Sequence, residues 1–562
     1  MCSKNVFMAN NQLSKTSFTI LLGFVIFLNL TGLFNEIMEP DGTLYAGLAK
    51  QIVKSGNWLN LWINGADWLD KPHLPFWLAA MSFKVFGFSA FAYKLPSFIL
   101  FIVSIVYCYK LAAVIYSKEI ARFSTLIYAS ALHIIISNFD GKVEIYLTAF
   151  VIAAMYHMYK AFEKKWFWHI VAAAFFAACA IMTKGIFVLI TIAAGFVIYW
   201  IRTKQWSEFV KLKWYLFVLL VFIFILPELY SLYSQFDQHP EKTVFGKTNV
   251  SGLRFFFWDS QFGRFFNNGP IKGKGDLSFF LHTSLWAFLP WSIVLLLAVI
   301  NMFRRKRPAV NYNRWMIGGT VLISFLMFSV SKFQLPHYIV ILFPLFAMMT
   351  AAYLVEEVSE KALKRINIFQ TVLFVLLVAA IILVIVFYSF NSIWTVIVFA
   401  LIAGVLILYK PGNGLLAVLK KNIGFALLLA IFLNCLFYPS LLRYQAGMMT
   451  GKWLNGQHLQ PKVTLYKCLS SSFDFYYNGE VDYSNPTADS INNLTLTDSL
   501  YLFSSLHDLE DFNRDKIDVR VLKIYPYFKV SQVTGKFINI KTRKETLNYI
   551  GIALVTRKNQ FK

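Results

Sequence analysis

The chain has 562 residues, of which 58% are hydrophobic, 18% aromatic and only 15% charged, with a net charge of +24. A soluble domain carries about 25% charged residues, so this composition excludes an ordinary soluble protein and indicates a chain solvated mostly by lipid. No nucleic-acid-binding motif or low-complexity basic arm accompanies the positive charge, so no nucleic acid partner is expected. Of the five cysteines, Cys108, Cys179 and Cys435 lie in apolar runs, Cys2 is at the N-terminus and only Cys468 lies in a polar region. This placement excludes a disulfide framework and any C-x-x-C metal site.

Apolar runs recur along the chain as far as residue 440, and many have the roughly 20 residues that a helix needs to cross a bilayer. We expect about thirteen spans and one further interfacial helix at 73–87. The expected spans are 18–37, 91–116, 121–137, 144–161, 166–183, 185–201, 214–233, 278–301, 314–331, 336–355, 366–390, 392–409 and 421–440. The first run lacks a small-residue cleavage site, so it is expected to be a retained span and not a signal peptide.

Lysine and arginine divide the short loops into two sets. Alternate loops are rich in them, whereas the loops between carry single lysines or none. Because positively charged loops stay in the cytoplasm, the pattern predicts a cytoplasmic N-terminus, with the loops 38–77 and 234–277 and the C-terminal region outside. The basic set contains Lys4 and Lys15; Lys118 and Arg122; Lys160, Lys164 and Lys165; Arg202, Lys204, Lys211 and Lys213; Arg304, Arg305, Lys306, Arg307 and Arg314; Lys361, Lys364 and Arg365; and Lys410, Lys420 and Lys421.

The composition changes after residue 445, where Asn, Asp, Ser and Lys become more frequent. Short β-rich runs appear at 463–469, 473–477, 500–503, 519–530 and 549–555, with a short helix expected at 506–513. The sequence therefore predicts two domains, a membrane domain over 1–445 and a small α/β or α+β extracytoplasmic domain over 446–562. Accessory packing or contact with an acceptor is the expected role of the second domain.

The first outer loop, 38–77, is longer and more patterned than a simple connector. It contains the acids Glu39, Asp41, Asp67 and Asp70, and the base Lys71. Asp41 opens an amphipathic segment that is expected to lie at the membrane interface. A helix N-cap is an equally good interpretation of Asp41. Helix capping and a surface ion pair of small energy would account for Asp70 and Lys71.

Other polar clusters mark the outer ends of later spans. They are Asp140, Lys142 and Glu144; Thr183-Lys184-Gly185; Arg264 within the loop 234–277; and the run 331–338, which contains Lys332 and His337. Each alone fits a helix-end charge, a snorkelling lysine, a solvated loop or a turn. Together they place acids and bases on one membrane face. An acid there could orient an attacking hydroxyl, and cations could stabilise a departing phosphate.

Several segments together resemble a known family. They are Met38-Glu39-Pro40-Asp41-Gly42-Thr43-Leu44-Tyr45-Ala46, Ser55-Gly56-Asn57-Trp58, Asn64-Gly65, Asp70-Lys71-Pro72-His73-Leu74-Pro75-Phe76-Trp77, Phe86-Gly87 and Lys94-Leu95-Pro96-Ser97. In this order they resemble the first outer loop of the aminoarabinose transferase branch of the GT-C glycosyltransferases, to which the protein O-mannosyltransferases are more distantly related. Met182-Thr183-Lys184-Gly185, Arg264-Phe265, Leu289-Pro290-Trp291-Ser292 and Leu335-Pro336-His337-Tyr338 are similar to later landmarks of that family.

The resemblance implies an α-helical polytopic membrane protein of GT-C type, with about 13 transmembrane helices and interfacial helices in the first outer loop. It implies a hexosyl- or pentosyltransferase of the bacterial inner membrane that moves a sugar from a polyprenyl-phosphate donor to an envelope glycolipid of lipid A type, a glycan or a protein. The catalytic positions fall on Asp41, Glu144 and Lys71, and the substrate-binding positions on Tyr45, Asp70, Lys184, Arg264, Lys332 and His337. Asp140 competes with Glu144 as the second acid, and Glu144 is expected to position Lys71.

The sequence also departs from the family pattern. Gly42 stands where Glu is usual, Leu44 where Arg is usual and Gln334 where Lys is usual, and Gln261 replaces a histidine three residues before Arg264. The departures leave the sugar and the acceptor open. No cofactor is implied with certainty, and a divalent metal stays an open question.

A transporter or flippase of lipid-linked sugars is the rival class. Such a protein would carry charges at the bilayer midplane and broken, repeated helices. Few ionisable residues lie inside the expected spans, and the polar groups gather at their outer ends. This distribution favours catalysis at the interface over transport.

Overall fold

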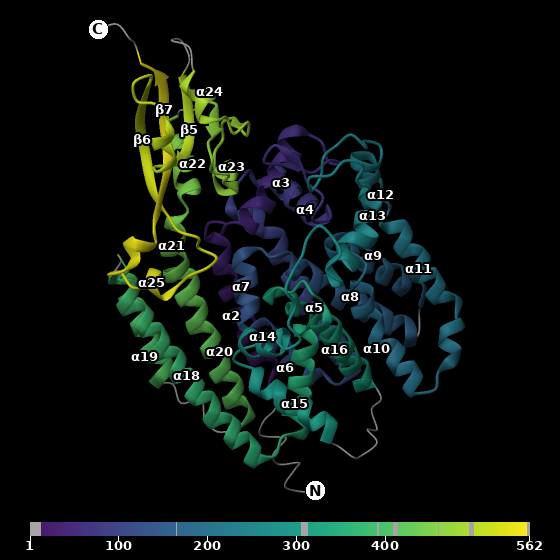
Figure 1. Cartoon of the computed structure of the whole chain (residues 1–562). Helices are drawn as coiled ribbons and strands as arrows, with labels where there is room; N and C mark the ends of the chain where they lie inside the picture. Colours follow the sequence, from purple (N-terminus) through teal and green to yellow (C-terminus); the bar gives the residue numbers. More distant parts are fainter. Residues whose placement is uncertain are drawn as a thin grey trace.

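The computed structural model describes residues 13–163, 166–304, 313–390, 393–408, 414–458, 460–493 and 499–558. A large helical body carries a small β-sheet at one end, and the sheet stands beside the first outer loop (Figure 1). Some of the basic residues behind the predicted orientation lie outside the described residues. They are Lys4, Lys164, Lys165, Arg305, Lys306, Arg307 and Lys410.

Within the described part of the chain, seven helical runs are long and apolar enough to cross a membrane, or nine if each of two bent pairs is one span. The seven are α2 with η1 (Lys15–Phe34), α5 (Ala90–Ile115), α8 (Val143–Glu163), α9 (Trp166–Lys184), η5 to η6 (Pro336–Glu357), α18 (Glu360–Tyr388) and α20 to η8 (Leu415–Tyr444). The bent pairs are α6 (Lys118–Ala129) with α7 (Leu132–Asp140) and α11 (Leu212–Phe224) with α12 and η3 (Leu226–Asp237).

Shorter apolar helices occupy the remaining expected spans. They are α10 (Val188–Arg202), α15 (Ser292–Arg304), α16 (Asn313–Val330) and α19 (Ile393–Leu408), and α14 (Phe279–Ala287) precedes α15. The expected interfacial helix is α4 (Leu74–Phe86). A polytopic helical fold is therefore confirmed, whereas the number thirteen stays a prediction because several of these helices are short for a bilayer.

The bend between α6 and α7 is 56° and coincides with contacts to a distant part of the chain. The helix breaks at Ser130 and Ala131, where the indole N–H of Trp291 donates to the Ser130 hydroxyl and the N–H of Leu132 donates to the carbonyl of Leu289. The bond to Leu289 gives the N–H of Leu132 the acceptor that the broken helix does not supply, as a buried backbone group requires. The bend sets the course of α7, which ends at Asp140 close to the first outer loop.

The first outer loop folds into α3 (Asp41–Ser55), the hairpin strands β1 (Trp62–Ile63) and β2 (Ala66–Asp67), and α4. Helix α3 buries Leu48 and Ile52 against aromatic side chains of α4 and of the C-terminal region, so the amphipathic segment is confirmed as a helix. Its N-cap residue is Pro40, and Asp41 is its first helical residue. The capping interpretation of Asp41 is therefore wrong, and the Asp41 carboxylate is left for other contacts.

The C-terminal region holds a five-stranded mixed sheet with the order β4-β3-β5-β7-β6. Its strands are β3 (Val463–Leu465), β4 (Val481–Asp482), β5 (Ser499–Ser505), β6 (Ile517–Tyr527) and β7 (Asn548–Arg557). The first pairings, β3 with β4 and with β5, are parallel, and those of β7 with β5 and β6 are antiparallel. The strand expected at 473–477 is wrong, because α23 (Ser471–Tyr476) forms there with Ser470 as its N-cap. The helix expected at 506–513 is one short 3-10 turn, η9 (Asp508–Asp511).

Two buried cations join this region to the helical body. The Lys50 ammonium donates to the carbonyls of Asp474, Phe475 and Tyr477 at 2.7–2.8 Å, so α3 holds the C-terminal end of α23. The Arg543 guanidinium donates to the carbonyl of Tyr388, the last residue of α18, at 2.7 Å. The sheet is thus fixed to the first outer loop on one side and to a membrane helix on the other.

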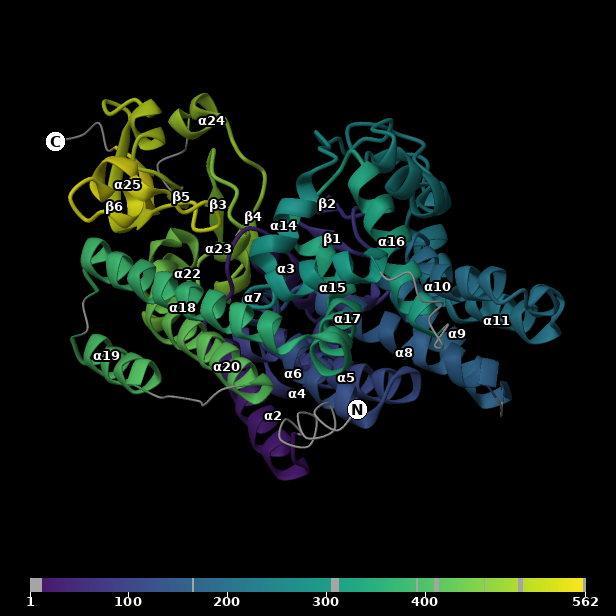
Figure 2. The ribbon, with the colours of Figure 1, turned by 90° about the horizontal axis from the view of Figure 1, so that it is seen from below.

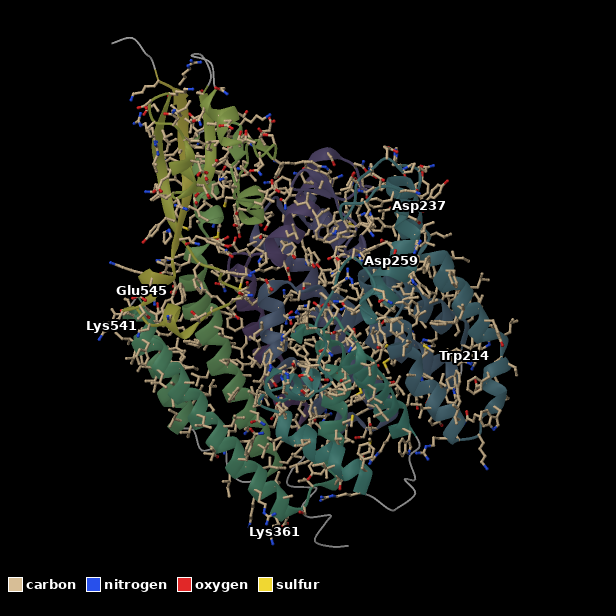
Figure 3. The ribbon with its side chains drawn as sticks, viewed as in Figure 1. Trp214, Asp237, Asp259, Lys361, Lys541 and Glu545 are labelled. Atoms are coloured by element: carbon tan, nitrogen blue, oxygen red, sulfur yellow. The ribbon has the colours of Figure 1, made fainter. Side chains whose placement is uncertain are left out.

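The polar loops and the sheet gather at the same end of the helices. Asp237, Asp259, Lys541 and Glu545 lie toward that end, and Lys361 in the first turn of α18 lies at the other (Figure 3). Viewed along the helices, α18, α19 and α20 lie beside the C-terminal sheet, and α10 and α11 lie on the opposite flank (Figure 2). The arrangement collects the candidate site residues at one end of the bundle.

Candidate active site

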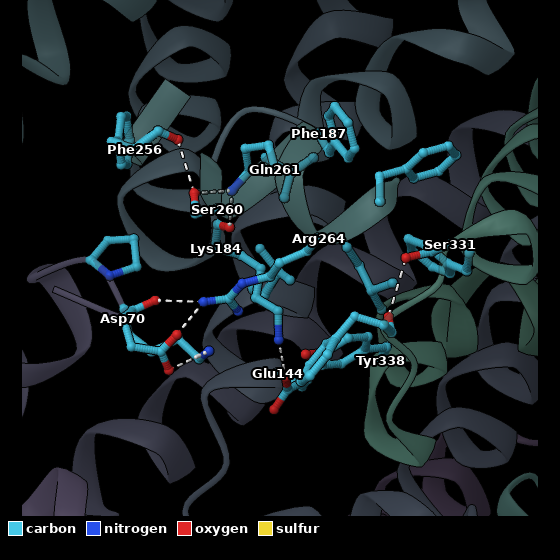
Figure 4. A pocket seen from close by; sticks show the side chains of 18 of the residues that line it. Asp70, Glu144, Lys184, Phe187, Phe256, Ser260, Gln261, Arg264, Ser331 and Tyr338 are labelled. Atoms are coloured by element: carbon cyan, nitrogen blue, oxygen red, sulfur yellow. Dashed lines mark hydrogen bonds and ion pairs between the residues drawn. The ribbon is translucent and has the colours of Figure 1, made fainter. Parts of the chain in front are cut away.

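A pocket lies between the first outer loop and the ends of the helices behind it (Figure 4). One part of its wall is charged and polar, and the rest is apolar. The polar part includes Asp70, Lys71, Glu144, Lys184, Arg264 and Tyr338, and the apolar part includes Leu147, Val188, Phe256, Phe280 and Phe328. A concave apolar site with a few convergent polar groups is the usual form of a ligand pocket.

Asp70 is the centre of the first ion-pair group in this wall. Its carboxylate accepts from the guanidinium of Arg264 on one oxygen and from the ammonium of Lys71 at 2.9 Å on the other. Burial alone would raise the pKa of Asp70, but Lys71 and Arg264 outweigh burial and hold it below its usual value. Burial first, and then Arg264, lowers the pKa of Lys71 to about 8.

Glu144 is the centre of the second group. It is 1% exposed and accepts from the Lys184 ammonium at 2.5 Å, and His337 Nε2 lies 3.6 Å from the same oxygen. The Lys184 ammonium also lies 3.8 Å from the centre of the Tyr338 ring, a cation–π contact. Lys184 is the last residue of α9 and Glu144 is in the first turn of α8, so the pair joins two helix ends.

Asp41 lies outside this pocket, beside the turn that joins α7 to α8. The Lys142 ammonium is 2.9 Å from Asp140 and 3.6 Å from Asp41. Burial alone would lower the pKa of Lys142, but Asp140 and Asp41 outweigh burial and raise it above its usual value. Tyr45, one turn after Asp41, has its pKa raised by burial and then by the charges of Asp41, Asp70 and Glu144. Its hydroxyl is therefore within electrostatic reach of both Asp41 and the pocket.

Helix α12 (Leu226–Leu232) and the π-helix η3 (Tyr233–Asp237) form hydrogen bonds with the loop 38–77. The Glu228 carboxylate accepts from the backbone N–H of His73 and lies 3.0 Å from His73 Nδ1, and both side chains are buried. Gln235, two turns later, pairs with both backbone groups of Leu61 and donates to Asp67. These contacts fix the turn that presents Asp70 and Lys71 to the pocket.

The structure brings most of the expected site residues together. Asp70, Lys71, Glu144, Lys184 and Arg264 line one pocket, with His337 against Glu144. Asp41 and Tyr45 lie next to it. Lys332 is not among the described lining residues, and its backbone N–H donates to the carbonyl of Phe265. Glu144 does not position Lys71 as expected, because Glu144 pairs with Lys184 and Lys71 pairs with Asp70.

Three contributors were not expected from the sequence. Tyr338 lines the pocket and stands in the Leu-Pro-His-Tyr run, which was the available signal. No signal in the sequence points to the pair of His73 and Glu228, since the two residues are 155 positions apart. Among the described residues no group of three or more His, Cys, Asp or Glu side chains is placed to hold a metal ion. Gln261, at the position of the missing histidine, donates to the carbonyl of Lys184.

Comparisons with known proteins agree with this architecture. Residues 70–230 match the family model described as dolichyl-phosphate-mannose-protein mannosyltransferase. The chain is 27% identical over 368 residues to an uncharacterized protein of Aquifex aeolicus (strain VF5), an alignment that covers 64% of this chain and 67% of that protein. It is 24% identical over 372 residues to the undecaprenyl phosphate-alpha-4-amino-4-deoxy-L-arabinose arabinosyl transferase 2 of Proteus mirabilis (strain HI4320), covering 64% of this chain and 63% of that protein.

The fold has a solved counterpart. The crystal structure of ArnT from Cupriavidus metallidurans bound to undecaprenyl phosphate superposes with a TM-score of 0.73 at 17% identity, covering 91% of this chain and 97% of that chain. At 91% coverage the structural match extends into the C-terminal region. The chain is a multi-pass protein of the bacterial inner membrane and an ArnT-like glycosyltransferase of GT-C type, similar in sequence to the aminoarabinose transferases and, over residues 70–230, to the protein mannosyltransferases.

Proposed function

We propose that this protein transfers a sugar from a polyprenyl-phosphate-linked donor to an acceptor of the cell envelope, on the outer side of the inner membrane. One observation carries the proposal. Lys71, Lys184 and Arg264 converge on one wall of a pocket whose remaining walls are largely apolar. Cations beside an apolar pocket are what a lipid with a phosphate headgroup requires.

The charges of this wall support a phosphate ligand. Three cations, Lys71, Lys184 and Arg264, face the two carboxylates Asp70 and Glu144, and the third carboxylate of the lining, Glu228, is turned to His73. The set of five that remains has an excess of positive charge. The Nε of Arg264 is buried and has no hydrogen-bond partner among the described residues. An unpaired buried donor is costly, and a phosphate oxygen would satisfy it.

The proposed reaction is a displacement at the anomeric carbon of the donor sugar. An acceptor oxygen forms a bond to this carbon while the bond to the phosphate oxygen breaks, and the bonding electron pair leaves with the phosphate. Lys71, Lys184 and Arg264 stabilise the developing negative charge. Asp41 takes the proton of the acceptor hydroxyl or orients it. Attack from the face opposite the leaving phosphate inverts the configuration of the anomeric carbon.

We assign Asp70 to positioning both Lys71 and Arg264, and Glu144 with His337 to positioning Lys184. We assign Tyr45 to holding the sugar, because the charges of Asp41 and of the pocket acids Asp70 and Glu144 all act on its hydroxyl. Lys332 keeps only a peripheral role in this proposal. Glu144, which lines the pocket, is the second acid in preference to Asp140, which is turned to Lys142.

The proposal includes the orientation and the division of the chain. The N-terminus is cytoplasmic, and the loops 38–77 and 234–277 and the C-terminal region are outside, which the distribution of lysine and arginine supports. Residues 1–445 form the transferase domain and 446–562 the C-terminal extracytoplasmic domain. The acceptor is an envelope glycolipid of lipid A type, a glycan or a protein. The name of the Proteus mirabilis relative supports an undecaprenyl phosphate-linked sugar as the donor.

The test follows radiolabelled sugar from membrane polyprenyl-phosphate lipids into envelope fractions. Wild type, Asp41→Asn and Lys71→Ala are compared at matched expression, with Lys54→Ala as the control, since Lys54 is an exposed lysine on the same helix as Asp41. Label should enter one fraction with wild type and Lys54→Ala and be lost with the other two variants. Labelled lipid that crosses the bilayer without transfer would instead indicate a flippase.

A further inference from the structure

Two carboxylates from separate helices share one ammonium at the edge of the site. Asp41 begins α3 and Asp140 ends α7, and the Nζ of Lys142 lies 3.6 Å from the first and 2.9 Å from the second. The Asp140 side chain is 4% exposed and the Asp41 side chain is 50% exposed. The ammonium therefore closes the buried side of the pair and leaves the outer side of Asp41 open to an acceptor.

The backbone forces the two carboxylates together. A Cβ at Gly42 would lie 3.1 Å from the Asp140 carboxylate and 2.8 Å from the side chain of Ile37, so the chain at Asp41–Gly42 passes directly against Asp140. Gly141 has φ +64°, a left-handed conformation that returns Lys142 toward both acids. The turn is thus shaped to aim Lys142 between them.

The local charges require a cation at this point. The second carboxylate oxygen of Asp140 is buried and has no hydrogen-bond partner in the described part of the chain. A buried carboxylate without a compensating charge is strongly unfavourable. Oxygen ligands from two acids are what Mg²⁺ and Mn²⁺ prefer. Here the space between the acids is filled by the Lys142 ammonium, a compact point charge with three donors.

We propose that the Lys142 ammonium holds Asp41 in place for the acceptor. It occupies the position between Asp41 and Asp140 that a divalent ion would need. In this proposal a lysine of the chain takes the place of a divalent metal ion beside Asp41. Lys142 is a positioning residue that acts through Asp41. The role of Asp41 rests on the proposed function, whereas the placement of the cation does not.

The proposal predicts that removal of the ammonium creates a metal site. Binding of Mn²⁺ to the purified full chain in detergent is followed through the loss of the free Mn²⁺ signal in electron paramagnetic resonance. Wild type and the control Lys54→Ala should show no saturable binding below about 1 mM, the weak end of carboxylate sites. Lys142→Met should gain one site at least about tenfold tighter, and Lys142→Met combined with Asp140→Asn should lose it.

Two results would overturn the proposal. One is saturable Mn²⁺ binding by the wild type that disappears in Asp41→Asn, because Lys142 would then give way to a metal. The other is Lys142→Met protein of normal melting temperature that binds Mn²⁺ no better than the control. Lys142→Gln is a second variant in case Lys142→Met does not fold. If both variants misfold, Mn²⁺ binding by the wild type still tests the proposal.

Transfer activity gives an independent readout. Chelation with EDTA should leave wild-type transfer within twofold of its untreated value. Lys142→Met should lose about tenfold or more, and Mn²⁺ should restore part of the loss to that variant alone. Wild-type transfer abolished by EDTA and restored by Mn²⁺ would contradict the proposal. If the wild type shows no transfer, the proposed function is contradicted. The proposal for Lys142 is then tested by the Mn²⁺ binding measurement alone.

Discussion

Arg264 binds Asp70 across 194 positions of sequence, through both the carboxylate and the backbone carbonyl of Asp70. The other carboxylate oxygen of Asp70 holds the Lys71 ammonium. One acid thus keeps two cations, one from the loop 38–77 and one from the loop 234–277, on the same wall of the pocket. Because Asp70 is shared, each cation retains donors for a ligand, and the wall is assembled before a phosphate arrives.

Arg264→Ala should weaken the binding of the lipid-phosphate donor. The variant removes one cation and leaves Asp70 paired with Lys71 alone, which reduces the positive charge of the wall. We expect the KM for the donor to rise about tenfold or more, since one charged hydrogen bond contributes about 1.5–3 kcal/mol. Arg264→Lys should recover only part of the lost donor affinity, because an ammonium lacks the planar guanidinium that can bind a carboxylate and a phosphate together. Initial rates against donor concentration measure this, and an unchanged KM would count against the assignment.

Lys71 should set an alkaline limit on transfer. Its pKa in the ligand-free protein is about 8, lowered by burial and then by Arg264. The ammonium is present below this pH and is lost as the pH rises through it, so kcat/KM should fall above about pH 8. Lys71→Arg keeps its charge and should extend the plateau to higher pH. A profile from pH 6 to 10 checks this, and identical alkaline limits in the two proteins would exclude Lys71 as the titrating group.

His73 should help to position Lys71, because it anchors the same turn of the chain to Glu228. Nδ1 lies 3.0 Å from the Glu228 carboxylate and Nε2 lies 2.9 Å from the carbonyl of Leu59, so the ring links both groups. His73→Ala leaves the buried Glu228 carboxylate without this side-chain partner, and a buried polar group left unpaired typically costs about 1–3 kcal/mol. We expect a lower melting temperature and a raised donor KM. His73→Ala combined with Glu228→Gln should recover much of the stability, and no recovery would mean that the two residues are not coupled.

Lys50 should be the main polar link between α3 and the C-terminal region. It donates to three carbonyls at the end of α23, and Lys50→Met leaves all three without that donor. The loss should lower stability by about 3 kcal/mol, since each unpaired buried acceptor costs about 1–3 kcal/mol and some will find water. Thermal unfolding in detergent measures it, with Lys54→Ala as the matched control. Equal melting temperatures for the two variants would contradict this role.

The sequence predicted the helical body and most of the site for physical reasons. Long apolar runs can only be buried in lipid as helices, and charged residues within them are rare enough that Lys184 and Glu144 stand out at helix ends. The amphipathic period placed α3, and short β-rich runs placed β5, β6 and β7. The family resemblance added the grouping of Asp70, Lys71, Lys184 and Arg264, which spacing alone does not give.

Other features depend on contacts that the sequence does not display. The run 473–477 is aromatic enough for a strand, but it becomes the helix α23, with Ser470 at its start and Lys50 at its end. Glu144 has a lysine from α9 closer to it than Lys71, and only the packing of α8 against α9 decides the partner. The break at Ser130 depends on Trp291, 161 positions away. In each case a tertiary contact overrides the local pattern.

Binding of undecaprenyl phosphate to the purified protein tests the central claim most directly, because it does not require the sugar or the acceptor to be known. Native mass spectrometry would compare wild type, Lys71→Ala combined with Arg264→Ala, and Lys54→Ala, each with undecaprenyl phosphate and with uncharged undecaprenol. The account predicts that wild type and Lys54→Ala retain one undecaprenyl phosphate and little undecaprenol, and that the double variant retains neither. Equal retention of the two lipids by the wild type, or full retention of the phosphate by the double variant, would contradict it.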